Sequence, residues 1–249
     1  MEQGQTPPVS MTVTGGSSGL GKAIIDAALD SHQFDEIYCI AKEGIHRQVR
    51  SIICDVSDPV QVMEAGVGFP DVFSTDVLVN CAGINRIGWL EDFPSQTWDE
   101  VMDTNAKSIF LMSRSFVHVG GEGLHRTILN IVSNASHMPM TGSLAYNASK
   151  GAAHIMTLQL ARELMSTHGI TVFGLSPAKM SGTQMSEYID SVVPGMRGWS
   201  EQYAIEYQLK NLLVGEEIEP ELPAELIVWL LSKHSRHKHL AGCIIPYGA

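Results

Sequence analysis

Three polar side chains in the middle of the sequence could carry out acid–base chemistry together. Tyr146 and Lys150 lie four residues apart, and Ser133 precedes Tyr146 by thirteen residues. Residues at positions i and i+4 share one face of a helix, so the phenol and the ammonium project together. A tyrosine with an ordinary pKa of about 10 is a poor base at neutral pH. A nearby ammonium favours the phenolate and would bring that pKa toward the working range.

A second segment has the composition of a phosphate-binding turn. The glycine-rich run TGGSSGLG, residues 14–21, follows an apolar stretch and precedes a helical pattern. Glycines let the backbone turn tightly and approach a pyrophosphate, and the N-terminus of the following helix offers free N–H donors. We therefore predict a dinucleotide site here. The same letters fit the Gly-x-Ser-x-Gly elbow of serine hydrolases, with Ser17 as the nucleophile. Only fourteen residues precede Gly15, however, and that fold takes its oxyanion loop from an earlier strand.

A parallel sheet must position these residues, and the rest of the sequence predicts one. Short apolar runs alternate with longer helical patterns, as in βαβ units. We predict a single doubly wound α/β domain over residues 1–249, with about seven strands and helices on both faces. The predicted strands are 9–14, 37–40, 51–54, 77–80, 127–132, 171–175 and 243–245. Helices are predicted at 20–30 and 146–168, and Gly169 ends the second one. Ser133 then follows the fifth strand, at the carboxyl edge where such folds bind ligands.

Three segments depart from that alternation. Residues 1–8 are predicted to form a loose polar arm. Residues 176–222 are rich in Met, Gly and Glu, and we interpret them as a helical flap over the site; an extra packing helix is the alternative. Residues 55–77 look short for a full crossover helix.

The composition excludes several functional classes. The 27 acidic and 16 basic residues give a net charge of −11, which argues against a nucleic-acid binder. No apolar stretch reaches the ~18 residues of a membrane span, and the first residues lack a signal-peptide pattern. The four cysteines have no Cys-x-x-Cys spacing, so we predict reduced thiols in a cytoplasmic protein, without disulfides or a metal site. The basic, histidine-rich run 233–239 is predicted to be a solvated loop.

Taken together, these features resemble the short-chain dehydrogenase/reductase family, from Val9 to Gly248. The matching pieces are the TGxxxGxG turn, Asp55-Val56, Asn80-Cys81-Ala82-Gly83, Asn105, Ser133, Tyr146-x-x-x-Lys150, and the Ser176-Pro177 turn with Thr183. The resemblance implies an NAD(P)-dependent enzyme that transfers a hydride between nicotinamide and a small carbonyl or secondary alcohol. It also implies a homodimer or homotetramer formed through the helices around Asn105 and Tyr146. A non-catalytic dinucleotide-binding sensor on the same fold is the alternative.

The resemblance implies a role for each matching position. Tyr146 would be the general acid and base, and Lys150 would lower its pKa and hydrogen-bond the nicotinamide ribose. Ser133 would hold the substrate oxygen, and Asn105 would anchor a water that relays protons through Lys150. Asp55 would accept from the adenine amino group, with a helix N-cap as its alternative role. The implied coenzyme contacts are Gly15, Ser17, Ser18, Gly19, Leu20, Gly21, Ala41, Lys42, Asp55, Val56, Asn80, Ala82, Gly83, Tyr146, Lys150, Pro177 and Thr183.

The end of the second predicted strand bears on the choice of coenzyme. An NAD site needs an acidic residue about 20 positions after the glycines. Ala41 stands where NAD enzymes of this family carry Asp, and Lys42 where many NADP enzymes carry Arg. A cation there attracts a 2′-phosphate, so we favour NADP(H) over NAD(H). Glu43, and the absence of a basic residue in the glycine turn, argue for NAD(H).

Two further observations concern the substrate side. Ala178 replaces the glycine that usually follows the proline in this family, and alanine takes a positive φ less freely. Four methionines fall in segments that border the substrate space in the family: Met138, Met140, Met180 and Met185. They suggest a soft apolar pocket, and plain core filling is equally open.

Overall fold

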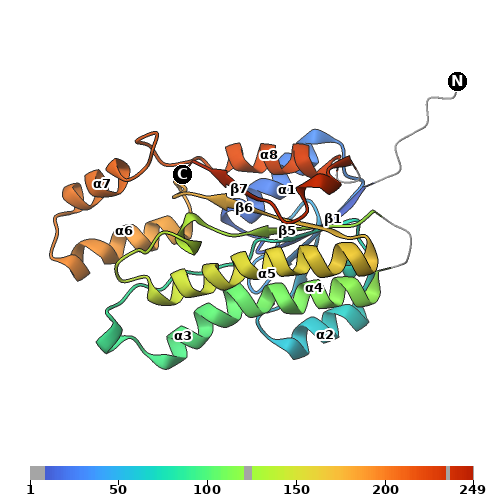
Figure 1. The fold of residues 1–249 in the computed structure, drawn as a ribbon, viewed down its shortest axis with the longest axis horizontal. Helices are drawn as coiled ribbons and strands as arrows, with labels where there is room; N and C mark the ends of the chain where they lie inside the picture. Colours follow the sequence, from blue (N-terminus) through green and yellow to red (C-terminus); the bar gives the residue numbers. More distant parts are fainter. Residues whose placement is uncertain (1–8, 121–124, 234–235, 249) are drawn as a thin grey trace, which may run out of the picture.

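A parallel sheet forms the centre of the molecule (Figure 1). The computed structural model describes residues 9–120, 125–233 and 236–248. Within them seven strands lie in the order β3-β2-β1-β4-β5-β6-β7, and every neighbouring pair is parallel. The strands are β1 (Ser10–Thr14), β2 (Glu36–Ala41), β3 (Arg50–Ile53), β4 (Val77–Asn80), β5 (Thr127–Ile131), β6 (Thr171–Pro177) and β7 (Ile244–Tyr247). The doubly wound parallel sheet predicted from the sequence is confirmed.

Helices cover both faces of this sheet. The helices are α1 (Gly19–Ser31), α2 (Pro59–Gly68), α3 (Ser95–Met102), α4 (Ser108–Val119), α5 (Leu144–His168), α6 (Gln184–Arg197), α7 (Glu201–Lys210) and α8 (Glu221–Leu231). α1 and α8 pack on one face, and α2, α4 and α5 on the other (Figure 1). A five-residue π-helical turn, Asp103–Lys107, joins α3 to α4. Short 3-10 helices occur at Pro70–Phe73, Leu90–Asp92, Asn134–Ser136 and Lys238–Leu240.

The central strands are buried on both sides, which explains their apolar composition. Every residue of β4, β5 and β6 is buried, as expected for parallel strands with helices on both faces. On one side Val13 belongs to an apolar layer with Ile24 of α1 and Ile227 of α8. On the other side Leu78 belongs to a second layer with Phe116 of α4. Burial of both apolar layers stabilises the sheet, and the strand ends that carry the site are held in place with it.

Local sequence determines where the helices begin and end. Gly169 has φ = 67° and ends α5, as predicted. At α2, Pro59 takes the first position and the Asp58 carboxylate accepts from the Val60 N–H at 2.8 Å. α2 is therefore a true crossover helix of ten residues, although segment 55–77 looked short for one. The strands and helices whose bounds were predicted agree with the structure to within one or two residues, whereas no bounds were predicted for α2, α3, α4 and α8.

The segment predicted as a flap contains α6 and α7, which extend beyond the sheet at the left of Figure 1. The predicted arm, residues 1–8, lies outside the described residues. His234 and Ser235 of the histidine-rich run lie outside them too. In the described part of the chain, no helix has both the length and the apolar character needed to cross a bilayer.

Candidate active site

A cavity of about 890 Å³ lies along the carboxyl ends of the strands. It begins at the glycine turn after β1, passes the ends of β4 and β5, and continues under α6 and α7. It passes the carboxyl ends of β1 and β4, and the strand order reverses between these two strands. Doubly wound sheets place their ligands at this switch point.

The glycine turn leaves no room for side chains at Gly15 and Gly21. Gly15 has φ = 68°, and its N–H donates to the Ile40 carbonyl at 2.7 Å. A Cβ on Gly15 would lie 2.9 Å from Ala82 Cα, and a Cβ on Gly21 would overlap the Gly15 carbonyl. Ser18, the N-cap of α1, makes no side-chain capping bond. The first N–H groups of α1 are thus left to a ligand, which fits a dinucleotide pyrophosphate.

The neighbouring turn after β4 is fixed to the first strand. The Thr14 hydroxyl accepts from the N–H groups of Cys81 at 3.0 Å and Ala82 at 3.1 Å. The backbone at Ala82 is therefore held against the glycine turn, and the two form one wall of the cavity.

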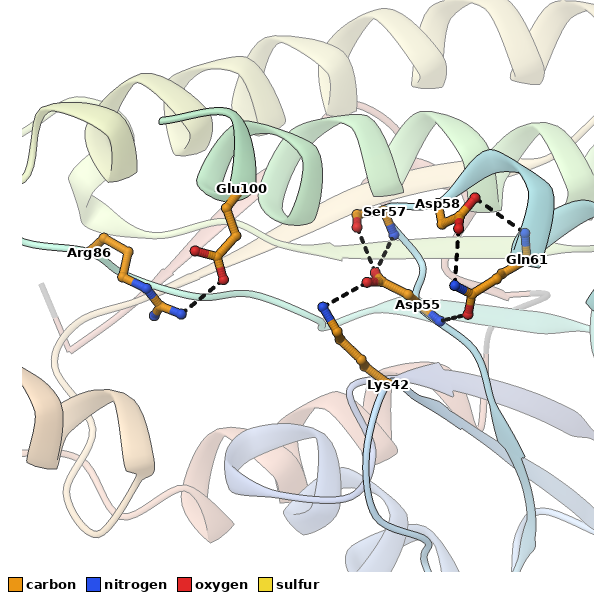
Figure 2. Close-up of polar contacts among 7 residues, drawn as sticks. All are labelled: Lys42, Asp55, Ser57, Asp58, Gln61, Arg86 and Glu100. Atoms are coloured by element: carbon orange, nitrogen blue, oxygen red, sulfur yellow. Dashed lines mark hydrogen bonds and ion pairs between the residues drawn. The ribbon is translucent and has the colours of Figure 1, made fainter. Parts of the chain in front are cut away.

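At the end of β2, Lys42 forms an ion pair with Asp55, which follows β3 (Figure 2). The two groups lie 2.8 Å apart, and 66% of the Lys42 side chain is exposed against 18% for Asp55. Partial burial acts to raise the pKa of Asp55, but hydrogen bonds from Lys42 and Ser57 outweigh it and hold that pKa below its usual value. The hydrogen bond to Asp55 raises the pKa of Lys42. Two residues predicted as separate coenzyme contacts are thus paired with each other.

Glu100 of α3 adds a further negative charge at this end of the cavity. Its carboxylate pairs with Arg86 at 3.0 Å, and Figure 2 shows this pair beside Lys42 and Asp55. This end of the cavity therefore holds more carboxylates than ammonium groups among its lining residues, which include Glu43 as well.

The three candidate catalytic side chains meet at the carboxyl end of β5. Ser133 begins the short helix Asn134–Ser136, with its hydroxyl accepting from the Ala135 N–H at 3.2 Å. Tyr146 and Lys150 lie one turn apart on α5, and the Lys150 ammonium lies 5.9 Å from the centre of the Tyr146 ring. That ammonium donates to the Ile131 carbonyl of β5 at 2.8 Å. All three line the cavity and are buried.

Burial dominates the acid–base properties of this group. It raises the pKa of Tyr146, and the hydrogen bond with Ser133 acts in the opposite direction without cancelling it. Burial also lowers the pKa of Lys150 to about 8. The sequence argument had the ammonium bringing the Tyr146 pKa down. In the structure burial outweighs the hydrogen bond from Ser133, and Lys150 is not among the groups that lower the Tyr146 pKa, so the phenol is protonated at neutral pH.

Two residues predicted to contact ligands lie outside the cavity lining. Asn80 is buried, and its side-chain amide donates to Asn130 of β5 at 2.8 Å, so it links two strands instead of facing the coenzyme space. The Asn105 amide pairs with both backbone groups of Ile84 at 2.8 Å and donates to Ser149 at 2.9 Å. Through these contacts the Asn105 side chain positions the loop at Ile84 against α5, and its water-anchoring role stays a prediction. The other predicted site residues all line the cavity.

The flap closes the far end of the cavity. Lys179 bridges Asp190 of α6 and Glu217, both at 2.6 Å. The Tyr188 hydroxyl of α6 accepts from the Ile87 N–H at 3.1 Å, which ties the flap to the opposite wall. All four methionines singled out in the sequence line this cavity. They contribute an apolar wall on the substrate side.

The turn after β6 tolerates alanine. Ala178 is buried, its N–H donates to the Tyr247 carbonyl of β7 at 3.0 Å, and it has no positive φ. Gly248, with φ = 73°, takes the left-handed conformation nearby. The substitution at 178 therefore leaves this wall of the cavity intact.

Sequence reasoning missed three charged residues that line the cavity: Glu100, Lys179 and Arg197. Arg197, the last residue of α6, donates to the Thr141 carbonyl at 3.1 Å. Its guanidinium carbon lies 4.6 Å from the ring centre of Trp199 and 5.8 Å from that of Tyr207. Gly198, with φ = 63°, makes the turn that brings Trp199 back against it. No local pattern signals this arrangement, because Thr141 lies 56 residues away.

Two other chemistries find no support in the cavity. No histidine occurs among its lining residues, so the Ser17 elbow has no imidazole base there. Over the described residues, no cluster of His, Cys, Asp and Glu side chains has the arrangement of a metal site.

Comparison with known proteins gives a consistent result. Residues 10–193 match the family model described as short chain dehydrogenase. The chain is 27% identical to gluconate 5-dehydrogenase of Gluconobacter oxydans, over 74% of this chain and 71% of that protein. It is also 27% identical to an NAD-dependent glycerol dehydrogenase of Listeria innocua, over 77% and 82%. A short chain dehydrogenase family protein of Francisella tularensis has a similar crystal structure, with a TM-score of 0.84, 25% identity and 96% of each chain covered.

Proposed function

Since the chain belongs to the short-chain dehydrogenase family and is an NAD(P)-dependent oxidoreductase, we propose that it interconverts a carbonyl and a secondary alcohol, with Tyr146 as the general acid and base. One observation carries this proposal: Ser133, Tyr146 and Lys150 meet in the same cavity as the glycine turn. The bound coenzyme supplies or accepts the hydride at its nicotinamide ring.

The chain's own residues handle the proton and the substrate oxygen. Ser133 and Tyr146 hold that oxygen through their hydroxyls. In the reduction direction the Tyr146 phenol gives its proton to the oxygen as the carbonyl carbon becomes tetrahedral. A pKa raised by burial keeps the phenol protonated at neutral pH for this step. The Lys150 ammonium, anchored on Ile131, stabilises the phenolate that remains.

We propose NADP(H) as the preferred coenzyme, held at its 2′-phosphate by Lys42. The absence of an acid at Ala41 supports this preference, because NAD enzymes use such an acid for the ribose 2′-hydroxyl. The Lys42–Asp55 pair and Glu100 weigh against it, and so does the NAD-dependent relative from Listeria. The preference is therefore expected to be moderate.

We also propose a homodimer or homotetramer assembled through α4 and α5, and a location in the cytoplasm. Phe110, Leu144 and Ile155 on these helices are 48%, 50% and 61% exposed, which supplies an apolar surface for association. The four cysteines are unpaired, as is usual for a reducing compartment.

The test combines coenzyme binding with turnover. NADPH and NADH are titrated by nicotinamide fluorescence, and the loaded protein is screened against ketones and secondary alcohols. Tyr146→Phe is expected to keep coenzyme affinity within about twofold and to lower kcat by at least about 100-fold. Coenzyme binding without turnover on any substrate would instead favour the sensor. Failure to bind either dinucleotide would refute the assignment of the glycine turn.

A further inference from the structure

The substrate end of the cavity contains a cation whose charge is not balanced by a carboxylate. Four cationic residues line the cavity: Lys42, Lys150, Lys179 and Arg197. Lys42 pairs with Asp55, and Lys179 with Asp190 and Glu217. Lys150 belongs to the proposed catalytic group. Arg197 has no carboxylate within 4.0 Å among the residues that the structure describes.

The surroundings of Arg197 hold its guanidinium in one place and leave donors unused. One terminal nitrogen donates to the Thr141 carbonyl, and the plane is supported by the rings of Trp199 and Tyr207. The Nε–H is buried and has no hydrogen-bond partner. A buried donor without a partner costs free energy, and an anion bound to the same guanidinium offsets part of that cost. A guanidinium held in this way loses little conformational entropy when it binds an anion.

Apolar side chains of α6 and of the loop before α5 line the cavity together with Arg197. They are Met138, Met185, Ile189 and Val193. A ligand that spans this region needs an apolar body between its reacting carbon and the group that meets the arginine. A single arginine presents a fork that matches a carboxylate, whereas phosphates are commonly held by several cationic or backbone donors.

From these observations we propose that the substrate is an oxo acid or hydroxy acid, whose carboxylate binds Arg197 while its carbonyl or hydroxyl lies at Tyr146. This inference rests on the proposed function and extends it by naming the substrate class. Arg197 then selects the substrate and sets its orientation, and it takes no part in the proton transfer.

The test uses matched acid and amide ligands on the coenzyme-loaded protein. Hexanoate and hexanamide, and 3-phenylpropionate and 3-phenylpropionamide, are titrated by calorimetry into wild type, Arg197→Gln and Arg197→Lys. We expect each acid to bind wild type at least about tenfold tighter than its amide, and the difference to fall below about threefold in Arg197→Gln. Arg197→Lys should retain part of the preference, because it keeps the charge without the planar fork.

A matched control separates recognition from loss of structure. Arg50 also lies over aromatic rings, those of Tyr38 and Phe69, but outside the cavity. Arg50→Gln should leave the acid preference unchanged. If Arg197 only held α6 against Thr141, its substitution would weaken acids and amides equally.

Three other outcomes of these titrations would each refute part of the proposal. Absence of an acid preference in wild type, or a preference that survives in Arg197→Gln, would overturn the assignment of Arg197 and leave the proposed oxidoreductase function standing. Tighter binding of phenyl phosphate than of 3-phenylpropionate would overturn the choice of a carboxylate. If the wild-type protein bound neither NADPH nor NADH, both the proposed function and this extension of it would be refuted.

Discussion

Replacing Lys42 with alanine tests how the coenzyme's 2′-phosphate is held. The Lys42 side chain is 66% exposed and its ammonium already pairs with Asp55, so solvent and a carboxylate both weaken its attraction for a phosphate. Exposed ion pairs contribute about 0.2–1 kcal/mol, and 1.4 kcal/mol corresponds to about tenfold in affinity. We therefore expect Lys42→Ala to weaken NADPH binding only about two- to fivefold and to leave NADH binding unchanged.

Asp55→Asn should act in the opposite direction. This change removes a negative charge beside the phosphate and frees Lys42 from its partner. Since Asp55 is only 18% exposed, the effect is less screened, and we expect NADPH to bind about three- to tenfold tighter. The asparagine carbonyl still accepts a hydrogen bond, so NADH affinity should change little.

Both variants are measured by fluorescence titration at low and high ionic strength. Lys107→Ala, which removes an exposed lysine paired with Asp103 at 3.0 Å outside the cavity, is the matched control. The NADPH effects should shrink at high salt, and the control should show none. Equal losses of NADPH and NADH affinity in Lys42→Ala would refute the placement of the 2′-phosphate. Tighter binding of NADH than of NADPH by wild type would refute the preference itself.

Three further outcomes follow from the packing. Lys150 has its pKa lowered by burial to about 8 from 10.5, so the penalty of its buried charge is fully present below pH 8 and disappears as pH rises through 10.5. Lys150→Met should therefore raise the free energy of unfolding at pH 7, by about 3 kcal/mol at most, with the gain shrinking in urea melts toward pH 10. Gly120→Ala would place a Cβ on the Arg126 guanidinium, which three backbone carbonyls hold, and should cost about 1–3 kcal/mol in the same assay. Lys179→Met should loosen α6 and raise KM for substrate, with coenzyme affinity unchanged in fluorescence titrations; a loss of coenzyme affinity would contradict a purely flap-anchoring role.

The elements that the sequence predicted well are those defined by local patterns. Apolar runs of four to six residues mark buried parallel strands, and the glycine turn lies directly between β1 and α1. Helices α3 and α4 were missed because the π-helical turn Asp103–Lys107 interrupts their periodicity. The orientation of the Asn80 side chain was missed because it depends on a hydrogen bond to Asn130 of the adjacent strand, 50 residues away in the sequence.

The ion pair of Lys42 with Asp55 could have been predicted from the expected pairing of β2 with β3. The parallel register places Ala41 of β2 beside Ile53 of β3, so the residues just beyond both strands leave the sheet at the same edge. Opposite charges there are close enough to pair. The position of Arg197 had no such signal, since a left-handed Gly198 and a loop far away in sequence create its surroundings.

The role of the last strand has a consequence for folding during synthesis. β7 supplies the Tyr247 carbonyl that holds Ala178, and Gly248 lies against Ile218 and Ala178. The glycine turn and the β1–β4 half of the sheet involve only residues before position 84. Chains grow from the N-terminus, so these residues leave the ribosome first, but the apolar layer behind β1 is completed only when α8 has been made. The wall around Ala178 receives its partner only after residue 247 has left the exit tunnel, so the substrate end is the last part of the cavity to be completed.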